Sequence, residues 1–273
     1  MALTTSSPAT QTFPTYLARL VRDRLHNSWK SLQWAWLDTV CQYRRSRIGP
    51  LWETINVIVM LLGLSLVSSA IFGSNLRDIV GYVAIGIIVW SAIAALISEG
   101  TMSFVRNTGY VTSSTLDVDL YVGRSVFKVF ITFAHHVLVY VLGVAIGFVP
   151  IGWTSLLAIP GILLLFINGF WVVTTFAFIC ARFRDIDPIV RNLLQLAFFV
   201  TPVFWNYKAI ASDRMFIVDY NIIFYFIEIV RSPLLGEIPP LSHYLVIGCV
   251  TVVGYLIAWQ TYRRMRPRLA FFV

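Results

Sequence analysis

An apolar run from Leu51 to Phe72 constrains this chain more than any other sequence feature. Its length matches the roughly 20 residues that an α-helix needs to cross a hydrocarbon layer. Directly before it stand Arg44, Arg45 and Arg47. Arginine is costly in hydrocarbon and is attracted to anionic cytoplasmic headgroups. We therefore expect a membrane protein whose first span begins on the cytoplasmic side.

Gly49 and Pro50 separate the basic segment from the apolar run. Proline has no backbone N–H, and at a first helical position that N–H would be unpaired anyway. The pair therefore predicts the end of one helix and the start of the next.

The composition extends the membrane assignment to the whole chain. Of its 273 residues, 58% are hydrophobic and 12% are charged, whereas about 25% of the residues in soluble proteins are charged. The net charge of +8 does not predict a nucleic-acid partner, because the arginines lie beside apolar runs instead of forming one continuous basic face. We expect an integral membrane protein.

The cysteines and the N-terminus exclude some alternatives. Cys41, Cys180 and Cys249 are far apart and form no CxxC pair, so we expect neither a disulfide framework nor a thiolate metal site. The segment 1–12 is rich in Ser and Thr and has no charged region followed by an apolar one. We therefore expect no cleavable signal peptide.

The pattern predicts an all-α polytopic membrane protein. Residues 1–14 are typical of a disordered tail, and 15–48 of an amphipathic interface helix lying in the membrane plane, although a helix packed on a cytosolic domain is an alternative. Its apolar stripe is Leu25, Trp29, Leu32, Trp36, Val40 and Tyr43. The domain 49–262 holds six predicted spans, near 51–72, 80–98, 125–149, 155–180, 189–205 and 243–260, and 263–273 is a basic C-terminus.

Charge asymmetry predicts that both termini are cytoplasmic. With this orientation most of the 21 lysines and arginines lie inside, and only Arg77, Lys208, Arg214 and Arg231 lie outside, as the positive-inside rule requires. The inner connections, predicted as Glu99–Arg124 with a short surface helix and as Ala181–Pro188, would face a cytoplasmic partner.

The last outer segment, 206–242, is too apolar for a polar loop. It predicts one or two short helices that dip back into the outer leaflet between the fifth and sixth spans. Many rings cluster towards this side, among them Phe198, Phe199, Phe204, Trp205, Tyr207 and Tyr225. They form either an ordinary aromatic belt or, in part, a path for sugars, because a ring face packs against the C–H face of a pyranose.

The chain carries no recognisable catalytic motif. A P-loop needs a lysine after a glycine-rich turn, yet Lys30, Lys128 and Lys208 never follow glycine. The adjacent His135 and His136 point about 100° apart on a helix, so they cannot both bind one ion unaided. We expect structural or pore-facing histidines.

Gly143 and Gly147 form a GxxxG, a spacing that permits close contact between helices. It is a weak indication of helix packing.

Four runs together resemble a known family. They are Tyr43–Trp52, Arg182–Ile186, Leu194–Trp205 and Ile227–Gly236. In this order they resemble the membrane subunit of type-two ATP-binding-cassette exporters for lipid-linked polysaccharides, of the O-antigen and teichoic-acid type. The Arg-Ser-Arg-Ile-Gly-Pro-Leu-Trp pattern favours O-antigen over capsule and teichoic acid.

The resemblance implies partners and site residues. It implies a homodimer in a bacterial inner membrane, docked on two copies of a nucleotide-binding subunit that holds ATP and Mg, and exporting an undecaprenyl-linked glycan. The residues implied at the ATPase interface are Arg44, Arg45, Arg47, Arg106, Arg182, Arg184, Asp185 and Asp187. The fifth span and outer loop would line or close the channel.

Two other classes of protein stay open. An integral-membrane transferase acting on a lipid-linked substrate would need a carboxylate or histidine site facing one leaflet. A channel-like or scaffolding protein would show no dependence on nucleotide.

Overall fold

The computed structural model describes residues 13–44, 46–73, 75–109, 117–209 and 215–272, and within these ranges the regular structure is helical throughout. The helices are α1 (Phe13–Tyr43), α2 (Leu51–Phe72), α3 (Leu76–Met102), α5 (Val118–Ile146), α6 (Ala158–Arg182), α7 (Ile186–Val200), α8 (Phe216–Asp219), α9 (Ile222–Leu234), α10 (Leu241–Met265) and α11 (Leu269–Phe272). Short 3-10 turns are η2 (Val105–Asn107), η3 (Trp153–Leu157), η4 (Tyr207–Ala209) and η6 (Arg266–Arg268).

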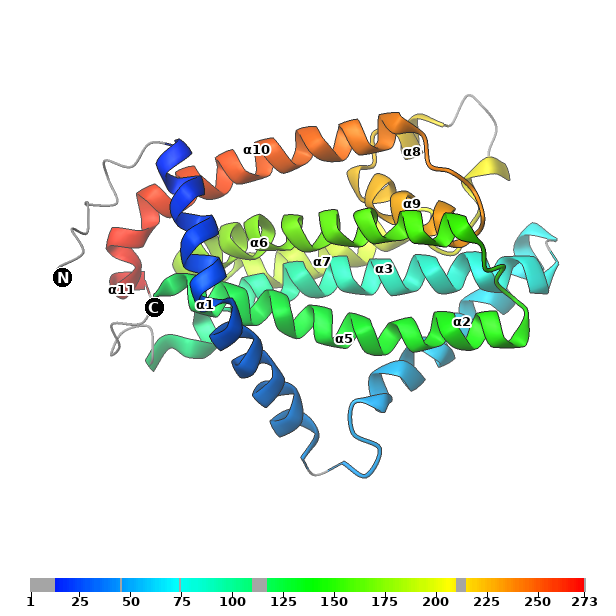
Figure 1. Cartoon of the computed structure of the whole chain (residues 1–273), viewed down its shortest axis with the longest axis horizontal. Helices are drawn as coiled ribbons and strands as arrows, with labels where there is room; N and C mark the ends of the chain where they lie inside the picture. The colour runs from blue at the N-terminus through cyan, green and yellow to red at the C-terminus, as the bar shows by residue number, and fades with distance from the viewer. Residues whose placement is uncertain (1–12, 45, 74, 110–116, 210–214, 273) are drawn as a thin grey trace.

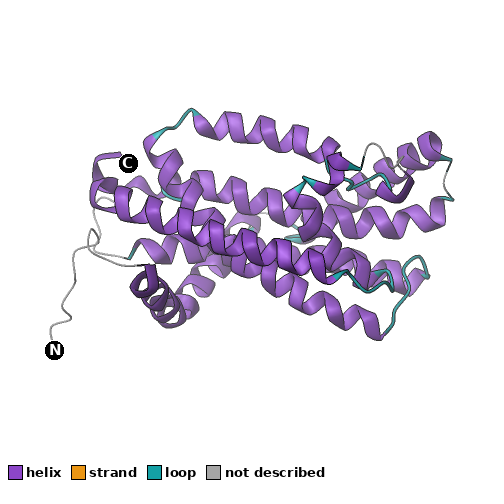
Figure 2. Cartoon of the chain, turned by 90° about the horizontal axis from the view of Figure 1, so that it is seen from above, coloured by secondary structure: helices purple, strands orange, loops and turns teal. Residues whose placement is uncertain are grey.

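The long helices run along one axis in both views (Figures 1 and 2). One end of the bundle holds α11 and the start of α1, and the other holds α8 and α9; we call them the α11 end and the α9 end. The start of α1 is tied to the last turns of α10, since the ring of Phe13 lies 5.6 Å from that of Trp259. Helix α1 then crosses the bundle transversely (Figure 1).

Five helices of the described chain are long and apolar enough to cross a membrane. These segments are Leu51–Phe72, Ile79–Met102, Val118–Ile146, Trp153–Arg182 and Leu241–Arg268. They correspond to five of the six predicted spans, so the polytopic all-α class is confirmed.

The predicted fifth span, 189–205, falls on a shorter helix. Helix α7 has 15 residues, which gives a rise of about 22 Å against the roughly 30 Å of a hydrocarbon core. It ends because Pro202 disfavours helical backbone at the residue before it, and Thr201 is accordingly extended, with φ −81° and ψ 135°.

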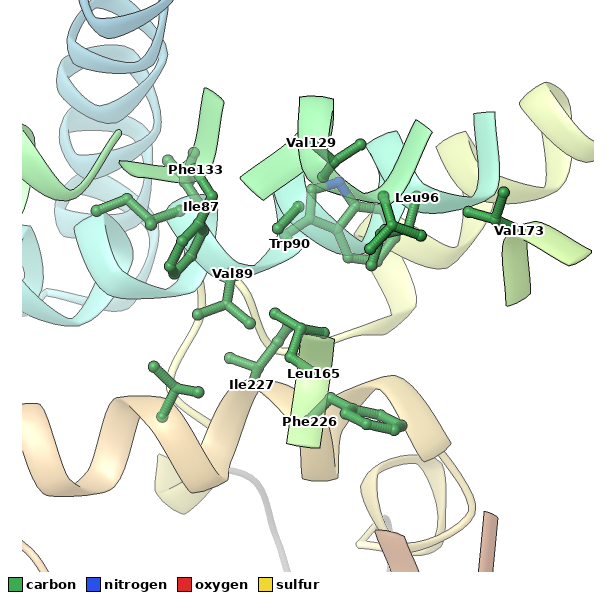
Figure 3. Close-up of a cluster of buried hydrophobic side chains, with 14 of the residues drawn as sticks. Ile87, Val89, Trp90, Leu96, Val129, Phe133, Leu165, Val173, Phe226 and Ile227 are labelled. Atoms are coloured by element: carbon green, nitrogen blue, oxygen red, sulfur yellow. The ribbon is translucent and has the colours of Figure 1, made fainter. Parts of the chain in front are cut away.

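Helix α3 is the centre of the bundle. Of its apolar window 72% is buried, against 33% or less in the other candidate spans. Figure 3 shows Ile87, Val89, Trp90 and Leu96 of α3 meeting side chains from three neighbours. Those neighbours are α5, α6 and α9, which contribute Val129, Phe133, Leu165, Val173, Phe226 and Ile227.

Several predicted boundaries need correction. Helix α1 begins at Phe13 and ends at Tyr43, so it starts before and stops short of the predicted 15–48. Glu99 still belongs to α3 and Arg124 already to α5, so the inner connection is much shorter than Glu99–Arg124. An apolar run marks only the part of a helix that can cross a membrane. Polar and charged residues continue the helical backbone of α3 and α5 beyond that part.

The GxxxG of Gly143 and Gly147 serves a turn within this chain. Gly147 ends α5 with φ +80°, and its N–H donates to the carbonyls of Gly143 and Val144. A Cβ on Gly143 would lie 3.2 Å from Val149, in the same connection. Within this chain Gly147 therefore acts as a helix terminator, the common use of a glycine in left-handed backbone, and close packing on another helix stays a prediction.

Candidate functional site

Helix α1 packs on α5 through its smallest side chains. Ser31, Ala35 and Thr39 are buried, and the Ser31 hydroxyl donates to the Leu120 carbonyl at 3.3 Å. A Cβ added to Gly123 would lie 2.6 Å from the Ser31 hydroxyl oxygen. Small residues thus let the two helices approach closely.

Part of the predicted apolar stripe faces away from the bundle, whereas Leu32 and Tyr43 are half-buried. Trp29 is 65% exposed, Trp36 56% and Val40 47%, while the side chain of Leu25 lies outside the described part. A bulky side chain at the position of Ser31 would hold α1 away from Gly123, so the small face packs and these three side chains stay exposed. Placement of these rings at headgroup depth remains a prediction.

An ion pair fastens the same seam. Arg124 of α5 donates to both carboxylate oxygens of Asp38 in α1, with Nη2 to Oδ1 at 2.7 Å and a second bond from Nε. Its Nη1 donates to Asn107 at 2.9 Å, and its guanidinium lies 5.7 Å from the ring of Trp34. We call this group the α1–α5 clamp: Asp38, Arg124, Asn107 and Trp34.

Sequence reasoning missed the α1–α5 clamp. Asp38 and Arg124 are far apart in sequence, and neither stands in a recognisable motif. The available signal was Asp38, an acidic residue in the second half of a basic amphipathic helix.

The predicted basic site divides into two places. Arg44 and Arg47 are exposed in the turn between α1 and α2, which projects from the side of the bundle, while Arg45 lies outside the described residues. The other members gather at the α11 end, where the guanidinium of Arg182 lies over Phe272 of α11 at 5.4 Å. The arginines near the first span therefore do not join the second group within this chain.

Most residues of the second group are exposed, but Asp187 is not. Arg106, Arg182, Arg184 and Asp185 are exposed. Asp187 is 8% exposed and accepts hydrogen bonds from Thr101 of α3 at 2.6 Å and from Arg191 at 2.9 Å. Its carboxylate ties the start of α7 to the end of α3 and does not present itself to a partner.

The surroundings of Asp187 favour its charged form. Burial raises the pKa of a carboxyl group, but the hydrogen bonds from Thr101 and Arg191 and the charge of Arg191 outweigh it. The pKa of Asp187 is therefore held below its ordinary value of 3.8.

The turn between α1 and α2 is held by a tyrosine. The Tyr43 hydroxyl donates to the Glu53 carboxylate at 2.5 Å. Burial and then this bond raise the pKa of Tyr43. Gly49 supplies the reversal with φ +63°, a conformation that glycine adopts without strain.

The rings predicted to line a sugar path form two groups. Phe198, Phe199 and Phe204 lie with centroids 5.5 to 6.2 Å apart, and Phe198 also meets Trp90 of α3 at 5.4 Å. Trp205 joins them by donating to the Phe199 carbonyl at 3.1 Å.

The second aromatic group lies on α9 and the start of α10. Phe224 contacts Tyr207 at 4.9 Å and Tyr225 at 5.4 Å, and His243 lies 5.1 Å from Tyr225. The Tyr225 hydroxyl donates to the Asp219 carbonyl at 2.9 Å. These rings pack the short outer helices together.

A fully buried charge holds α9 in place. Arg231 has no exposed surface and donates to Glu228 Oε2 from Nε at 3.0 Å and from Nη2 at 2.5 Å. Its Nη1 donates to the Pro202 carbonyl at 2.7 Å, and Ser232 and Tyr207 donate to Glu228 Oε1. The group joins α9 to the segment that follows α7.

A hollow adjoins this charge pair. It has a volume of about 440 Å³ and is lined by Tyr82, Asn206, Lys208, Glu228 and Glu237 among others. Across the described residues, no group of three or more His, Cys, Asp or Glu side chains could hold a metal ion.

Comparison with known proteins places the chain in a family. The ABC-2 type transporter family model matches residues 31–235, which is most of the chain. The chain therefore belongs to the ABC-2 type transporter membrane-domain family and is a multi-pass transporter subunit without a catalytic ATPase domain. Such permeases pair with a separate ATP-binding subunit, which holds the nucleotide, and typically lie in the cytoplasmic membrane.

The chain is also similar to one curated protein whose name states what it exports. The chain is 25% identical over 200 residues to the O-antigen export system permease protein RfbA of Myxococcus xanthus, covering 72% of this chain and 76% of the relative.

Proposed function

We propose that this chain is the membrane subunit of an exporter that carries a lipid-linked polysaccharide of the O-antigen type out of the bacterial cytoplasm. ATP hydrolysis on a separate subunit drives it. The distant relative named for O-antigen export supports the cargo, and the family supports the division of labour.

The path of the chain supports a six-passage topology with cytoplasmic termini. Helix α6 ends at the α11 end, and α10 begins at the α9 end (Figure 1). Between them, α7 and the segment 201–209 carry the chain along the bundle. The α11 end, with exposed Arg106, Arg182 and Arg184, is the cytoplasmic end in this proposal.

We propose a homodimer with two ATPase subunits, in which α7 and the outer aromatic rings border the glycan path. Exposed apolar side chains on α7 support this, since Leu193, Leu196 and Phe199 are more than half exposed in the single chain. The hollow beside them, about 520 Å³, is mostly apolar and includes Phe216 and Tyr220.

The observation that carries the mechanism is the α1–α5 clamp. A transverse helix on the cytoplasmic end can receive a push from a cytoplasmic ATPase, but it transmits that push only if it is fixed to a spanning helix. The bidentate Asp38–Arg124 pair supplies that fixation, because two parallel charge-assisted bonds set orientation as well as distance.

The test compares ATP turnover by a candidate partner subunit alone, with this chain, and with clamp variants, all in lipid discs. Wild-type chain is expected to bind the subunit and change its turnover. Arg124→Glu sets two carboxylates together, so this variant is expected to bind the subunit without changing its ATP turnover. The charge-swapped variant Asp38→Arg/Arg124→Glu is expected to regain part of the effect on turnover.

Arg264→Glu is the matched control, because this arginine is exposed on α10 away from the clamp. Export is read separately, as polysaccharide on the surface of cells that lack their own exporter. Failure of the wild-type chain to bind the subunit or to support export would contradict the proposal and favour a membrane transferase.

A further inference from the structure

A further hollow lies between α2, α3 and α5, apart from the outer rings. Its volume is about 260 Å³, roughly nine times the ~30 Å³ share of one liquid water. Polar residues in its lining include Glu53, Ser91, Glu99, Lys128 and His136. It is therefore large enough for a group the size of a sugar ring.

His136 lines this hollow and carries an unused ring nitrogen. The residue is 6% exposed, and its Nε2 atom has no hydrogen-bond partner among the described residues. Its Nδ1 atom lies 3.0 Å from the Ser91 hydroxyl oxygen. A buried polar atom left without a partner is costly, so a ligand or water should satisfy it.

The hydrogen bonds of Ser91 define which atom of His136 carries the proton. The single Ser91 hydroxyl hydrogen is donated to the Ile88 carbonyl at 2.8 Å. With that hydrogen on Ile88, Ser91 accepts from His136, and on this basis we assign the proton of the neutral imidazole to Nδ1. Nε2 then offers only a lone pair and requires a donor.

Other side chains of the lining carry further polar groups. One oxygen of Glu53 accepts from Tyr43, and the other has no hydrogen bond among the described residues. The one ammonium in the lining, Lys128, is already paired with Glu99 at 2.9 Å. Phe133 supplies a buried apolar wall.

The hollow lies where the first span begins. The Thr54 hydroxyl, in the first turn of α2, donates to the His135 carbonyl of α5 at 3.2 Å. His136 is therefore level with the start of α2, where the apolar run meets the basic turn. The hollow therefore adjoins the turn between α1 and α2 and is lined by both charged and apolar side chains.

We propose that this hollow binds the hydroxyl-bearing sugar nearest the lipid of a lipid-linked saccharide before export, an inference that rests on the proposed cargo. Sugar hydroxyls supply the donors that His136 and Glu53 lack, and the C–H face of the ring packs on Phe133. An anionic headgroup fits less well, because the lining carries two carboxylates, Glu53 and Glu99, against one ammonium, Lys128.

The test measures equilibrium binding of radiolabelled n-octyl β-glucoside to the full chain in lipid discs, below the micelle concentration, with empty discs subtracted. Radiolabelled n-octyl phosphocholine has a similar tail and no hydroxyl donors. Wild-type chain is expected to bind the glucoside saturably and the phosphocholine no better than empty discs. His136→Phe is expected to weaken glucoside binding roughly tenfold.

His135→Phe is the matched control, since His135 does not line the hollow and its Nδ1 atom contacts its own helix at the Ile131 carbonyl. Thr132→Val removes a hydroxyl from the lining with little change in shape and should weaken binding less. His136→Gln keeps an acceptor and should recover part of the affinity.

Equal glucoside binding by wild type and folded His136→Phe would overturn the inference, as would equal binding of both probes by the wild type. Water alone would then satisfy Nε2. If export succeeds while glucoside binding fails, only this inference falls. If glucoside binds while export fails, the proposed function falls.

Discussion

The guanidinium carbon of Arg231 lies 3.8 Å from the centroid of the Tyr82 ring, so a buried charge of α9 rests on the face of a ring from α3. The aromatic face attracts the cation, and Glu228 compensates its charge at 2.5 Å. The outer helix is therefore held to the central helix by polar groups inside an apolar bundle.

Arg231→Met is expected to lower the unfolding free energy by about 3–5 kcal/mol, because it leaves Glu228 buried without its cation. The double variant Glu228→Gln/Arg231→Met should lose less, since no charge stays unpaired. Thermal unfolding in detergent measures both. Glu237→Gln, which breaks the exposed pair with Lys208, is the control and should change stability little.

Gly123→Ala should loosen α1 from α5. Its Cβ would lie 2.6 Å from the Ser31 hydroxyl oxygen, and relieving such overpacking costs about 1–3 kcal/mol. Faster proteolysis within α1 and weaker binding of an ATP-binding subunit are the readouts. Gly248→Ala, on α10 where an added Cβ would meet open space, should leave both unchanged, and equal effects would refute the close-approach argument.

The Thr101–Asp187 bond should make the contact between α3 and α7 sensitive to acid. Because folding lowers the pKa of Asp187, its contribution to stability is fully present above the unfolded value of 3.8 and is lost as pH falls through the folded value. Thr101→Val raises the folded pKa, so the loss should begin at higher pH. Unfolding temperature against pH measures it, and an unshifted profile would exclude this role.

Phe198 and Phe199 are adjacent rings that differ in exposure, so variants at these two positions test packing and glycan contact separately. Phe198 is 8% exposed and Phe199 is 58% exposed. Phe198→Ala should cost about 3–5 kcal/mol of stability, whereas Phe199→Ala should keep the fold and reduce export if its ring borders the path. Surface polysaccharide and unfolding temperature, measured on both variants, distinguish the roles. Normal export by Phe199→Ala would remove this ring from the path.

The spanning helices were predictable because their signal is local. A run such as Leu51–Phe72 carries its own apolar length, and Gly49 with Pro50 marks the start of α2 in the sequence. The length of α7 was overestimated, since hydropathy continues past Thr201 while proline chemistry ends the helix. The residues after Thr201 are therefore apolar without being part of α7.

The site was less predictable because its contacts join distant segments. Asp38 meets Arg124, and Thr101 meets Asp187, across different helices. The apolar stripe of α1 was visible in its spacing, but which face packs depended on Gly123 of α5. The buried state of Asp187 likewise depends on α3, which no local pattern near it reveals.

The buried charge on α9 also bears on the order in which the chain is made. Tyr82, Pro202 and Glu228 all precede Arg231 in the sequence, so its ring, its carbonyl acceptor and its carboxylate are synthesised first. The guanidinium is produced when its partners already exist. Insertion from the N-terminus can therefore neutralise this arginine on arrival, without waiting for any segment still to be translated.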